Sequence, residues 1–115
     1  MDKNIVILEG EIGNDFKYGK TQDGKKFATF TLVLRNNSKL NDVSDDGEKR
    51  MPETYIRVMC FDKRQVEYLT NVGAHCGNRV NIFARLSSHR TEYRGVEYIQ
   101  NNVVVRDISI TKTKQ

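Results

Sequence analysis

The sequence predicts an all-β fold of five strands, with one short helix between the third strand and the fourth. Apolar and polar side chains alternate with period two in several segments, one segment has helical spacing instead, and turn residues separate these segments. The 115 residues are enough for one domain with its own core and too few for two. We therefore expect one domain over residues 1 to 110, followed by a short basic end at residues 111 to 115.

The first two strands lie on either side of a tight turn. Residues 5 to 12 are rich in β-branched side chains, and Gly10 interrupts them where a bulge or a close approach by another backbone would exclude a side chain. Asp23 and Gly24 are typical of a tight turn. In the second strand, residues 27 to 35, the even positions predict a buried face: Ala28, Phe30, Leu32 and Leu34.

Residues 36 to 52 have no periodicity and predict a long loop. Loops of this length in small domains are usually functional or disordered. The acidic cluster inside the loop would repel a phosphate backbone, so only the basic residues at its flanks are candidates to contact nucleic acid, namely Lys39, Lys49 and Arg50. The alternative is a solvated loop without a ligand.

The third strand, within residues 53 to 63, carries two different alternating sets of side chains. One set suits a core: Ile56, Val58 and Cys60. The other set combines aromatic rings with a guanidinium and a thioether: Tyr55, Arg57, Met59 and Phe61. A strand facing water would more often have Thr, Lys or Glu there, whereas aromatic rings with a cation between them form a stacking surface for single-stranded nucleic acid. The alternative is that a second layer or another subunit covers this face.

A short amphipathic helix follows the third strand. Asp62 is typical of a helix N-cap, with Gln65 three residues later, and Gly73 is typical of a helix end. The apolar positions between them have helical spacing: Val66, Leu69 and Val72.

The last two strands predict a hairpin that extends beyond the core, because residues 87 to 98 offer little that a core would bury. Residues 79 to 90 alternate, with Val80, Ile82, Ala84 and Leu86 expected inward and Asn81, Phe83, Arg85, Ser87 and His89 outward. Arg94 and Gly95 supply a turn. The fifth strand covers residues 96 to 110, and a change in its alternation predicts a bulge near Asn101 and Asn102.

Three strands, a helix and two strands is the order of the OB-fold, a five-stranded Greek-key barrel that binds oligonucleotides or oligosaccharides. The charge distribution favours an anionic partner. Residues 57 to 115 hold 10 basic and 5 acidic side chains, whereas residues 1 to 56 hold 9 basic and 10 acidic side chains.

The sequence indicates no metal, no cofactor and no disulfide framework, because Cys60 and Cys76 are the only cysteines and no paired Cys/His spacing accompanies them. Residues 1 to 4 are too polar for a signal peptide, and no apolar run approaches the roughly 18 residues of a membrane span. We expect a soluble, cytoplasmic protein without membrane contact.

An enzyme would need a nucleophile beside a base. The available pieces are His75 with Cys76, and His89 with Ser87 or Ser88. Neighbours in sequence rarely form such pairs, since the side chains must reach one another in space. We therefore expect no catalytic residue.

From about residue 4 to residue 110 the sequence resembles the bacterial-type single-stranded DNA-binding protein (SSB) family. Residues 10 to 15, Gly-Glu-Ile-Gly-Asn-Asp, resemble the family's G-x-(L/I)-G-x-D motif. Residues 53 to 63, Glu-Thr-Tyr-Ile-Arg-Val-Met-Cys-Phe-Asp-Lys, resemble its T-E-W-x-R-V-x-x-F-G-K block, the most specific of the matches. The resemblance implies a non-catalytic OB-fold that binds and protects single-stranded DNA in replication, recombination or repair.

The resemblance also implies roles for individual residues. Tyr55 and Phe61 stand at base-stacking positions, and Arg57 and Lys63 at backbone-contacting positions. The family has two further stacking aromatics where this chain has Ser38 and Thr91, so the nearby Tyr93 and Tyr98 are candidates to replace them. The remaining candidate phosphate contacts are Arg35, Lys39, Arg85, Arg90 and Arg94.

The resemblance implies a homo-oligomer in which first strands pair across a two-fold axis, with a tetramer expected and a dimer as the minimum. The acidic tail through which the family recruits replication enzymes is absent, so such recruitment is not expected. Two alternatives stay open: a factor similar to primosomal replication protein N in replication restart, and an OB-fold module that binds protein.

Overall fold

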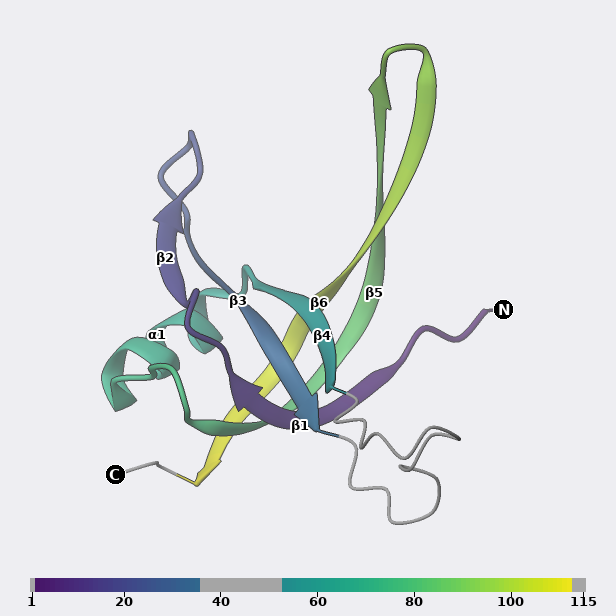
Figure 1. Ribbon diagram of the computed structural model, residues 1–115. Helices are drawn as coiled ribbons and strands as arrows, with labels where there is room; N and C mark the ends of the chain where they lie inside the picture. The colour runs from purple at the N-terminus through teal and green to yellow at the C-terminus, as the bar shows by residue number, and fades with distance from the viewer. Residues whose placement is uncertain (1, 36–52, 113–115) are drawn as a thin grey trace, which may run out of the picture.

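The computed structural model describes residues 2–35 and 53–112, which form six strands and one helix (Figure 1). Their order along the chain is β1 (Val6–Ile12), β2 (Lys17–Lys20), β3 (Lys26–Arg35), β4 (Glu53–Cys60), α1 (Lys63–Val72), β5 (Arg79–Tyr93) and β6 (Val96–Lys112). The predicted loop at residues 36 to 52 lies outside the described residues, and with it Lys39, Lys49 and Arg50.

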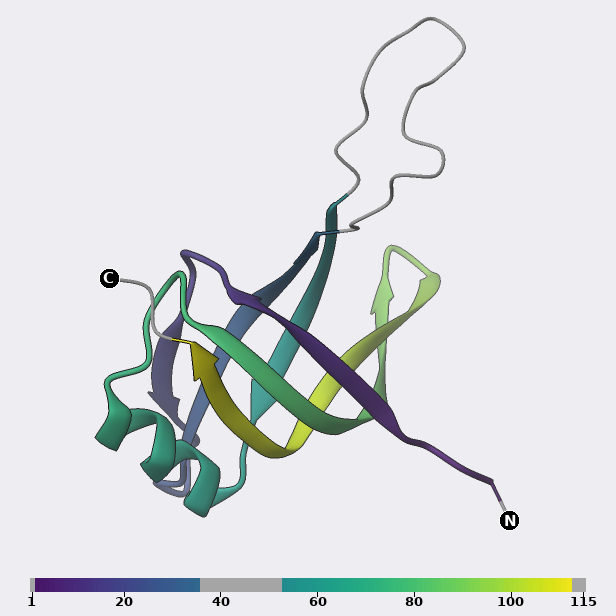
Figure 2. The same ribbon diagram turned by 90° about the horizontal axis from the view of Figure 1, so that it is seen from below.

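The strands form one sheet that closes into a barrel. Its order is β1-β5-β6-β4-β3-β2, and an additional pairing between β1 and β3 closes it. All neighbours are antiparallel except β4 and β6, which are parallel at Val58 opposite Val103. The predicted OB-fold class is confirmed, and Figure 2 shows the strands curving around one another with α1 at one end.

Gly10 makes the closure possible. β1 pairs with β5 through most of its length and reaches β3 only at Glu11 and Ile12. A Cβ added to Gly10 would lie 2.6 Å from the Val33 carbonyl oxygen, which is closer than Cβ atoms in proteins come to a non-bonded heavy atom. The close backbone approach expected from the sequence is therefore confirmed, and a side chain at this position would push β1 away from β3.

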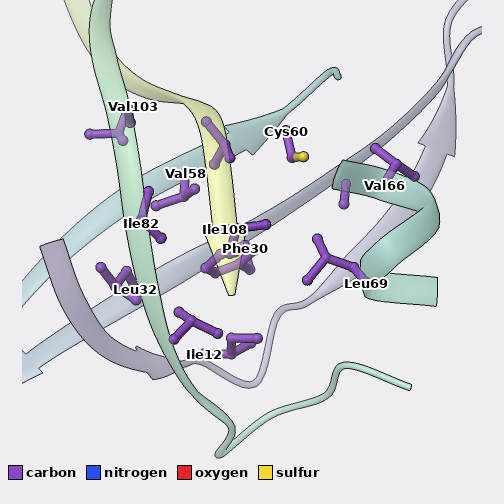
Figure 3. Close-up of a cluster of buried hydrophobic side chains, with 14 residues drawn as sticks. Ile12, Phe30, Leu32, Val58, Cys60, Val66, Leu69, Ile82, Val103 and Ile108 are labelled. Carbon is purple, nitrogen blue, oxygen red and sulfur yellow. The ribbon is translucent and has the colours of Figure 1, made fainter. Parts of the chain in front are cut away.

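The core fills the barrel and the space under α1 (Figure 3). Its largest fully buried side chains come from five of the elements: Ile12, Phe30, Leu32, Val58, Leu69 and Ile82. As predicted, the even positions of β3 and β4 face inward, with Leu34 and Ile56 only partly buried near the strand ends.

The helix is fastened to β6 by side chains as well as by packing. Asp62 caps it by accepting hydrogen bonds from the backbone N–H groups of Arg64 and Gln65, and Gly73 ends it with a left-handed φ of 68°. The Gln65 side-chain oxygen accepts a hydrogen bond from the Ile108 N–H (3.0 Å). The Tyr68 hydroxyl accepts one from the Ile110 N–H (2.9 Å). Ile108 and Ile110 both pair with β5 on one side, and on the other side no described strand pairs with them, so the helix supplies the acceptors for these two backbone donors.

Three details of the sequence prediction were wrong. The structure has six strands rather than five, because residues 17 to 20 pair with β3 as the short strand β2. The second error concerns two apolar side chains. Leu86 is exposed, since it lies in the hairpin beyond the point where β1 last pairs with β5, and Val72 is exposed in the last turn of α1. Both side chains continue an apolar pattern past the edge of the core.

The third error is the position of the bulge. Asn101 and Asn102 pair in register with β5. One shift lies at the strand ends, between Arg79 and Val80, and the other lies where Phe83 pairs with Asp107 and Ala84 with Val105. At this second shift Arg106 is the extra residue. The bulge lets two successive polar side chains, Arg106 and Asp107, stay exposed while Val105 and Ile108 are both buried.

Candidate nucleic-acid interface

The outer face of β3 and β4 carries the predicted stacking residues. Antiparallel register places Thr31 opposite Arg57 and Val33 opposite Tyr55, so these side chains share the face away from the core. Tyr55 is 64% exposed and Phe61 47% exposed. Over the described part of the chain, no second layer covers this face, so both rings are available to stack on a planar ligand.

The same face continues onto the long hairpin. Met59 of β4 pairs with Val104 of β6, which in turn pairs with Arg85 of β5. From there to the hairpin tip the register has no further shift, so alternation keeps the following side chains on this face. They include three of the predicted site residues, Arg85, Tyr93 and Tyr98, and also His89.

Two arginines of the hairpin are placed differently. Arg90 alternates onto the opposite face, where its guanidinium lies 3.9 Å from the Glu97 carboxylate. Arg94 is at the turn, in a left-handed conformation with φ 53°, followed by Gly95 with φ 79°. The Arg94 guanidinium lies 5.2 Å from the centre of the Tyr93 ring. Figure 1 shows this hairpin rising away from the barrel, as its composition predicted.

Tyr55 belongs to a polar network at one end of the β3–β4 face. Its hydroxyl donates a hydrogen bond to Glu53, which also pairs with Arg35 at 3.0 Å. Arg35 pairs at 3.0 Å with Glu11 of β1 as well. The hydrogen bond to Glu53 raises the pKa of Tyr55 above its usual 10.0, and the bond to Glu11 raises the pKa of Arg35. Tyr55 is therefore a neutral phenol at physiological pH, and Arg35 has its charge balanced by two carboxylates.

The charge of Arg57 is balanced in the same way, here by Asp15. No pattern in the sequence connects these two residues. Arg57 Nη1 lies 3.0 Å from Asp15 Oδ2. Asp15 also accepts hydrogen bonds from the Thr31 N–H (2.8 Å) and hydroxyl (2.7 Å). Partial burial would raise the pKa of Asp15, but these bonds, a bond to its own backbone and the Arg57 charge outweigh burial and lower the pKa below 3.8. Arg57 is thus held in place by the segment between β1 and β2.

The other end of the face has a different character. Phe61 follows β4, and its ring centre lies 5.9 Å from that of Phe27. Beside the pair is a groove of about 500 Å³ lined by Lys25, Lys26 and Lys63 together with Phe61 and Glu67. Lys63 was predicted as a backbone-contacting residue from the family resemblance. Lys25 and Lys26 were not, because only the fold shows that the β2–β3 turn ends beside Phe61.

The residues considered for catalysis or metal binding make other contacts. His75 Nδ1 lies 2.8 Å from the Cys76 carbonyl oxygen, and the Ser88 hydroxyl donates to the Asn101 side chain. Burial raises the pKa of the Cys60 thiol to about 11. Within residues 2–35 and 53–112, no group of three or more His, Cys, Asp or Glu side chains could hold a metal ion. In the same ranges, no helix is both long enough and apolar enough to span a membrane.

Comparison with solved structures shows the same fold. Plasmodium falciparum SSB, solved in complex with ssDNA, is similar with a TM-score of 0.78 and 17% identity, over 97% of this chain and 97% of that chain. The mitochondrial single-stranded DNA binding protein Rim1 of S. cerevisiae is similar with a TM-score of 0.73 and 17% identity, over 99% and 100% of the two chains.

Comparison at the sequence level identifies the family. No curated protein matches the chain. The model of the single-strand binding protein family, however, matches residues 3–111, which is nearly the whole sequence. On this match and on the barrel that the chain forms, the protein belongs to the single-strand binding protein family.

Proposed function

We propose that this protein binds and protects single-stranded DNA, largely independently of base sequence and without catalysing a reaction. The observation that carries the proposal is the pair of exposed rings, Tyr55 and Phe61, on one uncovered sheet face of a member of this family. The similar Plasmodium falciparum structure is itself a complex with ssDNA.

The geometry of the face suggests how a strand is bound. Tyr55 and Phe61 are six residues apart along an extended segment, or about 20 Å at roughly 3.3 Å per residue. They would therefore stack on different bases of one strand. Every base has a π-face, so stacking tolerates any sequence. Tyr93 and Tyr98 on the hairpin would extend the path, with Arg85 near its start.

In the cell, this activity fits the coating of single strands during replication, recombination or repair in the cytoplasm, by a homo-oligomer of which a tetramer is the expected form. Support for an assembly comes from two mostly exposed apolar side chains, Ile7 on β1 and Ile5 just before it.

The test is alanine substitution of each ring, read by fluorescence anisotropy with a labelled oligo-dT. Stacking contributes about 1 to 3 kcal/mol per base, so Tyr55→Ala and Phe61→Ala should each weaken binding about 5- to 150-fold. Stacking neutralises no phosphate, so it contributes no counterion release on binding. The dependence of affinity on salt should therefore stay nearly unchanged when a ring is removed.

Tyr18→Ala is the matched control, because Tyr18 is an exposed tyrosine of β2 that pairs with Ala28 and so lies on the other side of the sheet. It should bind like wild type. If the two face variants also bind like wild type but lose oligomerisation or thermal stability, the face is a protein interface and the proposal is wrong.

A further inference from the structure

The two ends of the β3–β4 face differ in charge. At the Phe61 end, the groove described above, here called the lysine groove, is lined by Lys25, Lys26 and Lys63 against Glu67, three positive charges against one negative. At the Tyr55 end, a second groove, the acidic groove, is lined by the charged residues Glu11, Asp15, Glu53 and Arg35, three negative against one positive. A phosphate backbone is attracted to the first and repelled by the second.

The lysines are also free to take new partners, whereas the arginines are not. Lys25, Lys26 and Lys63 are exposed, and within the described ranges they form no ion pair, while Arg35 and Arg57 are both paired. The carboxylates nearest in sequence to the lysines are engaged elsewhere. Asp23 accepts a hydrogen bond from the Thr21 hydroxyl, and Asp62 caps α1.

The β2–β3 turn holds Lys25 in a fixed position. The Lys25 N–H donates to the Thr21 hydroxyl oxygen (3.1 Å), and the Lys25 carbonyl accepts from the Thr21 N–H (2.8 Å). Gly24, with φ 87°, allows the turn. The two successive lysines therefore leave the turn beside the Phe27 and Phe61 rings rather than from a free loop.

We propose that the lysine groove binds the phosphates of the single strand next to the base on Phe61, with Lys25 and Lys26 as phosphate ligands beside Lys63. This inference rests on the proposed function. The strand leaves the sheet face over the β2–β3 turn and the first turn of α1. At the acidic groove, by contrast, binding depends on stacking against Tyr55, and Arg57 acts as a positioning residue held by Asp15 rather than as a free phosphate contact.

The experiment measures affinity for oligo-dT between 50 and 200 mM salt for wild type and a set of double variants. Each phosphate neutralised on a single strand contributes about −0.7 to the slope of log K against log salt. For Lys25→Gln with Lys26→Gln, the slope should therefore be less negative by about 1.4. The affinity deficit of this variant should shrink about sevenfold between the two salt concentrations.

Two comparison variants remove the same number of positive charges elsewhere. Lys3→Gln with Arg106→Gln changes exposed residues that line neither groove and should keep the wild-type slope. Arg35→Gln with Arg57→Gln should weaken binding with a smaller change in slope than the lysine variant. Melting curves of all variants check that the fold is intact. We expect an intact fold for the lysine variant because Lys25 and Lys26 are both exposed.

The outcomes separate this inference from the function on which it rests. If wild type fails to bind single strands, the proposed function is wrong. If wild type binds, but the Lys25 and Lys26 variant keeps the wild-type slope, or the arginine variant loses more slope than the lysine variant, the strand does not leave by the lysine groove.

Discussion

Asp15 shows how a single carboxylate can organise a binding face at the scale of a residue. It joins the segment after β1 to Thr31 on β3 and to Arg57 on β4, so it fixes the distance between three parts of the chain. Thr31 donates two of these hydrogen bonds. Each is stronger than a bond between neutral groups because its acceptor is charged.

Asp15→Asn should lower the melting temperature at pH 7 by roughly 4 °C, from a loss of about 1 kcal/mol for a half-exposed, charge-assisted network. The pKa of Asp15 is lowered in the folded state. Its stabilisation is therefore complete above the ordinary value of 3.8 and is lost as the pH falls through the lower folded value. The difference from wild type should narrow between pH 7 and pH 2, measured by circular dichroism. Asp2→Asn is the control and should match wild type at every pH.

The sequence predicted the exposed rings of this face but not the groups that surround them. The period-two pattern of residues 53 to 61 was enough to separate Tyr55 and Phe61 from Val58 and Cys60, because side-chain alternation is local. The contact between Arg57 and Asp15 joins residues 42 positions apart. Such a contact depends on how the barrel closes, which no local pattern reports.

At the scale of an element, the β5–β6 hairpin is the part of the protein that extends furthest from the core. Every described side chain from Ser88 to Asn101 is exposed. The hairpin is held by its own strand pairing and by a two-residue turn at Arg94 and Gly95 whose positive φ angles suit a tight hairpin. Its tip therefore contributes little to the stability of the barrel.

Replacing residues 89 to 100 with Asn-Gly should leave the melting temperature near that of wild type while weakening single-strand binding at least about fivefold, since Tyr93 and Tyr98 are lost. The removed segment holds two arginines and two glutamates, so its net charge is zero and the net charge of the protein is unchanged. Anisotropy and melting curves measure both. Changing only Arg94 to Asn keeps the hairpin and is the control for the turn. A large loss of stability on shortening would mean that the tip packs against another part of the assembly.

Elements with strong periodicity were predicted well, and elements without it were not. The capped helix and the turn residues of both hairpins carry local signals, and the structure confirms them. β2 has four residues, Lys-Tyr-Gly-Lys, with no apolar alternation, and it forms only because β3 offers an edge. The bulge was misplaced because two successive exposed residues, Arg106 and Asp107, mark it more directly than the valine run does.

At the scale of the whole molecule, one edge of β1 has no hydrogen-bonding partner among the described residues over most of its length. Val6 to Gly10 pair with β5 on one side, and the pairing with β3 begins only at Glu11. Among the described residues nothing pairs with the other edge of this stretch. Two apolar side chains are exposed here, Ile5 just before β1 (60%) and Ile7 on it (75%), and Phe83 beside Ile7 is 40% exposed. Proteins usually protect such an apolar edge.

Two copies that pair their β1 strands about a two-fold axis would cover both the edge and the apolar side chains. We therefore expect wild type to be at least a dimer by light scattering at micromolar concentration, and Ile7→Glu to shift it toward monomer because two carboxylates would face each other near the axis. The control is Val72→Glu, which changes an exposed valine on α1 and should keep the wild-type mass. A monomeric wild type, or equal masses for wild type and Ile7→Glu, would show that β1 is not the interface and that another part of the chain covers its edge.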